Sequence, residues 1–134
     1  MADASEAVRI AVMTRLKAAL PAASGYPALQ VYSDPPANMA LPAVTLDRVI
    51  DEPDDLLADD VSIVTVTLTI WSGARGPKQT AAVRSAIREL MHDADLDLET
   101  GGAVMCRYVR GDVTRDSDGQ TYMGSVMLRV TTEH

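Results

Sequence analysis

Phenylalanine is absent from this chain of 134 residues, and its larger aromatic residues are one tryptophan and four tyrosines. Proteins that bind single-stranded nucleic acid usually stack the bases on aromatic side chains that lie beside basic ones. This chain instead combines few aromatics with a net charge of −7. Its composition therefore argues against a role in binding single-stranded nucleic acid.

Cysteine and histidine are also scarce. Cys106 is the single cysteine, which excludes an intrachain disulfide. Because Cys106 ends the apolar run 103–106, we expect an inert strand residue, with a reactive thiol as the alternative. His92 and His134 are the two histidines, too few and too widely spaced to supply a catalytic base beside a nucleophile or a zinc ligand set. We expect no enzyme activity, no metal site and no cofactor, and a structural role for His92 as a cation at the end of a helix.

Long hydrophobic runs are also missing. The longest, residues 61–71, is interrupted by four Ser and Thr residues and falls short of the roughly 20 residues that a membrane-spanning helix needs. The first six residues are acidic where a signal peptide would be basic. These features predict a protein made in a cytoplasm that has no membrane partner.

Apolar residues make up 47% of the chain, enough for residues 1–134 to fold as one domain that buries about two-thirds of its unfolded surface. Hydrophobic periodicity predicts a first helix opened by a capping box of Asp3 and Glu6 and stopped by Pro21. A second helix starts near Pro77 and ends at His92. The strands predicted by alternation and turn residues are 30–32, 43–50, 61–71, 104–114 and 121–132, with Asp118-Gly119 as a hairpin turn.

This order, α-β-β-β-α-β-β, predicts an α+β fold in which both helices pack on one face of a largely antiparallel, mixed sheet. The alternation within 61–71 gives the strand two different faces. One face is apolar: Val64, Val66, Leu68 and Ile70. The other is Thr65, Thr67, Thr69 and Trp71. We expect the threonine face to be either wet or buried against a partner, and Trp71 to pack under the second helix or in a subunit interface.

The negative charge is concentrated in two segments. Residues 51–60 carry six acids and no base, and residues 93–99 carry four acids and no base. The first segment reads as a mobile loop with three open roles: a cation site, a solvated loop, or a loop that docks a partner. Its carboxylates repel one another, so we expect it to be extended.

Two further motifs have ordinary structural interpretations. The Gly73-Ala74-Arg75-Gly76 segment precedes a helix and could bind phosphate, or its glycines could simply shape the turn. The segment 114–119 fails the calcium-loop pattern at both ends and is typical of a tight turn.

A family resemblance covers nearly the whole chain in order. Val31-Tyr32 comes first and is followed by a proline-rich loop. Further along, a strand ends in Trp71-Ser72, and a helix then leads to Leu90-Met91-His92-Asp93-Ala94. With the late segment 115–121, this order resembles the tail-completion, or tail-terminator, family of long-tailed phages and phage-like gene transfer agents. The acidic segment 51–60 maps onto no motif of that family.

The resemblance implies a virion structural subunit that caps the tail tube as a hexameric ring, ends tube polymerisation and joins the tail to the head-side connector. Its partners would be further copies of itself, the tail-tube protein and the connector, while DNA passes the lumen without specific binding. Such a subunit is made in the bacterial host cytoplasm and resides at the head-proximal end of the virion tail. The alternative is a small acidic adaptor or assembly chaperone that captures a basic partner.

The residues expected to make these contacts are mostly acidic. They are Asp51, Glu52, Asp54, Asp55, Asp59, Asp60, Trp71 and Arg75.

Overall fold

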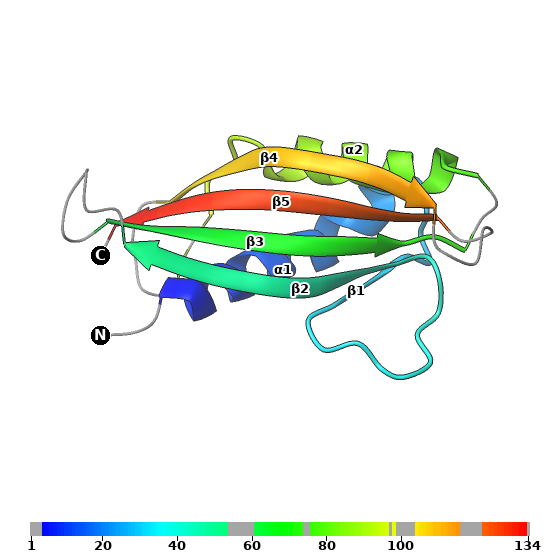
Figure 1. The fold of residues 1–134 in the computed structure, drawn as a ribbon, viewed down its shortest axis with the longest axis horizontal. Coiled ribbons are helices and arrows are strands. Elements are labelled where there is room, and N and C mark those ends of the chain that lie inside the picture. The colour runs from blue at the N-terminus through cyan, green and yellow to red at the C-terminus, as the bar shows by residue number, and fades with distance from the viewer. Residues whose placement is uncertain are drawn as a thin grey trace.

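A computed structural model describes residues 4–53, 61–73, 76–96, 98, 104–115 and 122–133. Within these ranges the chain forms two helices and five strands in the predicted order (Figure 1). The helices are α1 (Ala4–Ser24) and α2 (Lys78–Met91). The strands are β1 (Gln30–Tyr32), β2 (Ala43–Pro53), β3 (Val61–Trp71), β4 (Val104–Arg115) and β5 (Tyr122–Glu133).

The strands build one mixed sheet with the order β1-β2-β3-β5-β4. β1 is parallel to β2, and all other neighbours are antiparallel. Both helices lie behind the sheet in Figure 1, so they cover one face and leave the other free of helices. The predicted α+β fold, with two helices on one face of a largely antiparallel sheet, is confirmed.

The hydrophobic core lies between the sheet and the two helices. α1 contributes Val8, Val12 and Leu16, which are fully buried. The apolar face of β3 meets them, and its Val64, Val66, Leu68 and Ile70 are also fully buried. Burial of these side chains at about 1.5–3 kcal/mol each supplies the main driving force for folding.

The prediction that Pro21 stops the first helix is wrong, because α1 continues through Pro21 to Ser24. Leu20 and Ser24 are both buried on the sheet side of α1, so one more turn gains packing against the core. The Ser24 hydroxyl donates to the Pro21 carbonyl (3.1 Å), and the helix ends at Gly25, whose φ of +82° suits glycine. Asp3, the expected cap, lies outside the described residues.

β2 is three residues longer than predicted. Asp51, Glu52 and Pro53 were expected in a loop, but they continue the ladder with β3, where Pro53 lies opposite Ser62. The long partner strand explains the difference, because β3 offers hydrogen-bonding positions back to Val61. Residues 54–60 lie outside the described part of the chain.

The hairpin of β4 and β5 is confirmed by its register, which runs from Val104 opposite Thr132 to Arg115 opposite Tyr122. Its predicted Asp118-Gly119 turn lies outside the described residues. Two strands carry an extra residue relative to their partners, Asp47 in β2 and Val109 in β4. These β-bulges increase the local twist of the sheet.

Gly124 of β5 marks the closest approach of the sheet to α2. A Cβ at this position would lie 2.7 Å from Cγ2 of Thr80 and 2.9 Å from the backbone oxygen of Asp112. We expect Gly124→Ala to lower the free energy of unfolding by about 1–3 kcal/mol through overpacking, as measured by urea denaturation. Adding Thr80→Ser removes the nearer clash and should restore part of the loss. An unchanged unfolding midpoint for Gly124→Ala would show that the sheet and helix can separate freely here.

Candidate interaction surface

One face of the sheet carries no helix (Figure 1). We call it the open face. The cross-strand register assigns alternate residues of four strands to it. Its principal members are Thr45, Arg48, Thr65, Thr67, Thr69, Trp71, Met105, Arg107, Arg110, Asp112, Met123, Ser125, Met127 and Arg129.

The threonine face of β3 lies on the open face, opposite the core, as the alternation predicted. Thr65 and Thr67 are half-buried. Thr69 is more enclosed, at 7% exposure, and its hydroxyl donates to the carboxylate of Asp47, the bulge residue of β2. The threonines therefore form a polar strip in which Thr69 is hydrogen-bonded to β2, while Thr65 and Thr67 remain partly accessible from outside.

Trp71 ends β3 on the open face, opposite Ala43 of β2 and Met123 of β5. Its indole Nε1 donates to Oγ1 of Thr45 (3.0 Å), and the ring is half-buried. The expectation that Trp71 packs under the second helix is therefore wrong, since its neighbour Ile70 takes the core side. A half-buried aromatic fixed by a hydrogen bond is suited to contact a partner.

The turn after Trp71 is held by a residue that sequence reasoning missed, Gln79 in the first turn of α2. Its side-chain Oε1 accepts from the Ser72 hydroxyl (2.7 Å) and from the Gly73 backbone N–H (2.9 Å). Gly76 has a φ of +83°, which confirms that glycine shapes this strand-to-helix turn. Arg75 lies outside the described residues, and Pro77 is the N-cap residue of α2 rather than part of it.

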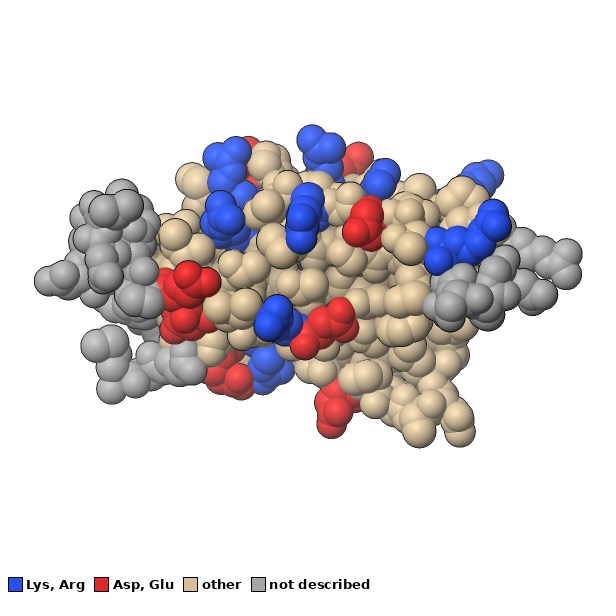
Figure 2. Space-filling view, viewed as in Figure 1, with Lys and Arg blue, Asp and Glu red and all other residues tan. Residues whose placement is uncertain are grey.

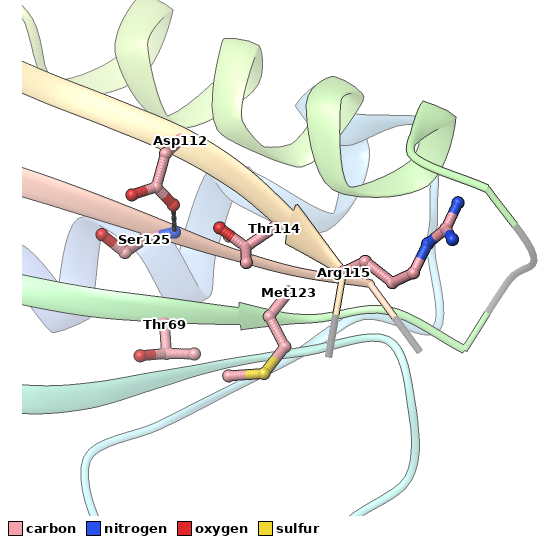
Figure 3. Close-up of a pocket in the computed structure, with 7 residues that line it drawn as sticks. Thr69, Asp112, Thr114, Arg115, Met123 and Ser125 are labelled. Atoms are coloured by element: carbon pink, nitrogen blue, oxygen red, sulfur yellow. Dashed lines mark hydrogen bonds between the residues drawn. The ribbon is translucent and has the colours of Figure 1, made fainter. Parts of the chain in front are cut away.

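A hollow of about 270 Å³ opens on the open face where β3, β5 and β4 run side by side (Figure 3). Asp112 lies at its rim, and its Oδ1 accepts from the backbone N–H of Ser125 (3.0 Å). Thr69, Thr114 and Met123 complete most of the lining, while Arg115 extends away from the group in Figure 3. The hollow is large enough for a side chain from a partner and shallow enough to remain wet.

Within the described residues the two edges of the sheet differ in net charge: β4 carries three exposed arginines and Asp112, whereas β2 carries three exposed acids and Arg48. Figure 2 shows most of the Lys and Arg side chains of this view over β4, β5 and α2. Arg107, Arg110 and Arg129 are exposed there, and Arg107 lies directly opposite Arg129 across the strand pair. Sequence reasoning missed this grouping, because Arg107 and Arg129 are brought together only by the register of the hairpin.

The acidic residues predicted to make contacts divide between described and undescribed parts. Asp51 and Glu52 are exposed near the end of β2. Asp54, Asp55, Asp59 and Asp60 lie outside the described residues. The structure thus brings Asp51 and Glu52 to one edge of the sheet, whereas Trp71 lies at the other end of the neighbouring strand.

Cys106 and His92 both contact other parts of the fold. Cys106 is fully buried on the core side of β4. Nδ1 of His92 accepts from the backbone N–H of Tyr108 (3.1 Å), so the imidazole links the end of α2 to β4. This bond requires a lone pair on Nδ1, which differs from the expected role of a helix-end cation. His134 lies outside the described residues.

Burial raises the pKa of the Cys106 thiol to about 11, an effect that the nearby positive charge of Arg15 only partly offsets. The unfolded chain therefore loses this proton first as pH rises from 9 toward 11, and stability falls across that range. We expect slow labelling of native Cys106 by a thiol reagent at pH 8. Above pH 9, the native protein should also lose more stability than its Cys106→Ala variant. Rapid labelling without unfolding would contradict the burial.

Among the residues that the structure describes, no group of three or more His, Cys, Asp or Glu side chains could hold a metal ion. Within the same ranges, neither helix is long and apolar enough to cross a membrane. What the described surface offers is a set of polar, methionine and arginine side chains suited to contact another protein.

Comparisons with known proteins agree with this picture. The sequence profile of the family described as tail completion protein gp17 matches residues 10–133. A search of curated proteins found no match. Among solved structures, a chain of the virion of a native gene transfer agent particle has the same fold, with 22% identity, a TM-score of 0.77 and coverage of 99% of this chain and 100% of that one. The gp17 protein of bacteriophage SPP1 also shares the fold, with 20% identity, a TM-score of 0.64 and coverage of 98% and 91%.

The matched segment begins within α1 and includes the rest of that helix, α2, all five strands and the turn after Trp71. Because the match extends over far more than half of the chain, this protein belongs to the family of the tail completion protein gp17.

Proposed function

We propose that this tail completion protein closes into a hexameric ring on the head-proximal end of a finished tail tube, ends tube polymerisation there and joins the tail to the head-side connector. Membership of the family supports the placement in a phage or gene-transfer-agent tail. The likeness to a chain of a gene transfer agent virion supports the fold that such a ring subunit would use.

The observation that carries the proposal is the open face. A five-stranded sheet covered by helices on one side alone leaves Trp71, two methionines of β5 and four arginines on its other side. Partly exposed aromatic and methionine side chains beside exposed arginines are typical of protein contacts. A ring needs a heterologous interface, in which each copy presents two different surfaces to its neighbours, and the sheet has two edges of different charge.

The subunit acts in this proposal by binding rather than by catalysis. Cys106 is fully buried, and His92 is engaged with a backbone amide, so neither serves as a nucleophile or a base toward an outside substrate. DNA would pass the lumen without specific contacts, because acidic segments of the chain do not attract phosphates.

The test is reconstitution with the tail-tube protein of the same particle. With the subunit present, electron microscopy should show tubes that stop growing and carry a six-fold ring at one end, and these capped tubes should attach to heads. Tubes that grow equally long with and without it, or a subunit spread along the tube wall, would contradict the proposal. Binding to a basic partner without any effect on tubes would favour the adaptor alternative.

A further inference from the structure

The open face carries a cluster of three arginines, Arg107, Arg110 and Arg129. All three side chains are exposed, and no ion pair of theirs is found among the described residues. Asp112 of β4 lies on the same face and accepts from the backbone N–H of Ser125. Residues directly opposite on antiparallel strands have Cβ atoms roughly 5 Å apart, and like charges there are unfavourable. The Arg107–Arg129 pair therefore favours an acidic occupant from outside.

Apolar side chains lie among these charges on the same strand. Met105 is 54% exposed and Val109 is 39% exposed, two of the three large hydrophobic side chains exposed in the described part of the chain. Arg107 lies between them in β4, which forms one edge of the sheet. Apolar residues ringed by arginines are typical of a protein interface rather than of a surface that remains in water.

The opposite edge of the sheet has the complementary charge. β1 covers only Ala43–Thr45 of β2, so the sheet ends at β2 beyond that point. The residues that follow include three exposed acids, which we call the acidic edge: Asp47, Asp51 and Glu52. Arg48 is the one base among positions 46–53.

We propose that the arginine cluster of one copy binds the acidic edge of a second copy, so that the subunits join head to tail through opposite edges of their sheets. The inference rests on the ring of the proposed function and names the two surfaces that form its interface. A back-to-back contact between two arginine clusters would place like charges together. The head-to-tail contact pairs opposite charges and leaves each copy with one free surface of each kind, which is the condition for a closed ring.

Charge reversal of each edge tests the pairing. Arg107→Glu with Arg110→Glu makes both edges acidic, and Asp51→Lys with Glu52→Lys makes both edges basic. Each double variant should need at least about tenfold more protein to assemble than the unaltered chain, measured by sedimentation in solution and on tail tubes. An equimolar mixture of the two variants should regain the unaltered mass, because every contact in an alternating ring again joins opposite charges.

A matched control for the arginine-cluster variant is Lys17→Glu with Lys78→Glu, which makes the same change in net charge as that variant, on the exposed surface of the two helices. It should assemble like the unaltered chain. Urea denaturation of all variants confirms that they are folded, since exposed substitutions usually change stability little.

Normal assembly of either edge variant would overturn the inference, as would a mixture that fails to reassemble. Stronger assembly of the arginine-cluster variant with the unaltered chain would favour a back-to-back contact and overturn it as well. If the unaltered chain and both edge variants all cap tubes as rings, this inference fails while the proposed function stands. If the unaltered chain forms no ring on tubes, the proposed function fails.

Discussion

Trp71→Ala is expected to abolish ring assembly while leaving a subunit that still folds. Truncation of a fully buried tryptophan costs about 3–5 kcal/mol. Because the indole is half-buried, we expect a loss of about 2 kcal/mol in the free energy of unfolding. Tryptophan anchors in interfaces often contribute 2 kcal/mol or more to binding, which weakens each contact by about 30-fold or more. Six contacts in a ring would multiply that effect.

Two variants separate the indole's bulk from its hydrogen bond. Trp71→Phe keeps most of the ring volume and loses the bond to Thr45, whereas Thr45→Val removes only the acceptor. We expect both to assemble more weakly than the unaltered chain and more strongly than Trp71→Ala, as measured by sedimentation and by ring counts on tubes. A Trp71→Ala subunit that caps tubes normally would show that the indole lies outside every interface.

Reversing the charge of the acidic segment should impair docking or DNA passage in the finished particle about as strongly as Trp71→Ala impairs ring assembly. Asp51 and Glu52 belong to the acidic edge, so in a hexamer the other four carboxylates of residues 51–60, from each of six copies, would lie around one circumference. We propose that this band either faces the DNA path or meets a basic rim on a neighbouring tail or connector protein. Changing Asp54, Asp55, Asp59 and Asp60 to lysine should leave docking intact and hinder DNA passage in the first case. In the second case it should prevent docking.

Salt and a neutral variant distinguish these two cases. Docking through exposed charges weakens as salt rises, because the screening length is about 10 Å at 0.1 M. Changing the same four aspartates to asparagine removes charge without reversing it. This variant should pass DNA normally if the band faces the lumen and should dock weakly if the band meets a basic rim. Normal docking and DNA delivery by the four-lysine variant would mean that the segment is only a solvated surface.

Periodicity was enough to predict the element order and the two faces of β3. Hydrophobic residues at every second position can face only one side of a sheet, so Val64 to Ile70 had to form the core side. The same argument placed Trp71 on the other side, although it could not show that no helix covers that side. The predicted helix end at Pro21 was wrong because burial of Leu20 and Ser24 outweighs the tendency of proline to break a helix.

Some features of the surface could not be predicted from the sequence, because they depend on how distant segments are aligned in the fold. Arg107 and Arg129 are far apart in the chain, and only the hairpin alignment places them opposite each other. Gln79 looked like an ordinary polar residue of a helix until the turn brought Ser72 and Gly73 to its side-chain oxygen. A buried polar residue in the first turn of a helix that follows a Gly-rich segment is the signal that could have indicated this role.

The two bulges, at Asp47 and Val109, bear on how unassembled copies behave in a crowded host cell. Val109 lies in the edge strand β4, and Asp47 lies just beyond Thr45, where β1 no longer covers β2, so both mark places where an unpaired backbone could otherwise recruit any other exposed strand. An irregular, twisted edge is a poor template for such indiscriminate ladder formation. We therefore expect newly made subunits to accumulate without forming fibres and, in the proposed function, to remain available until a completed tube recruits them.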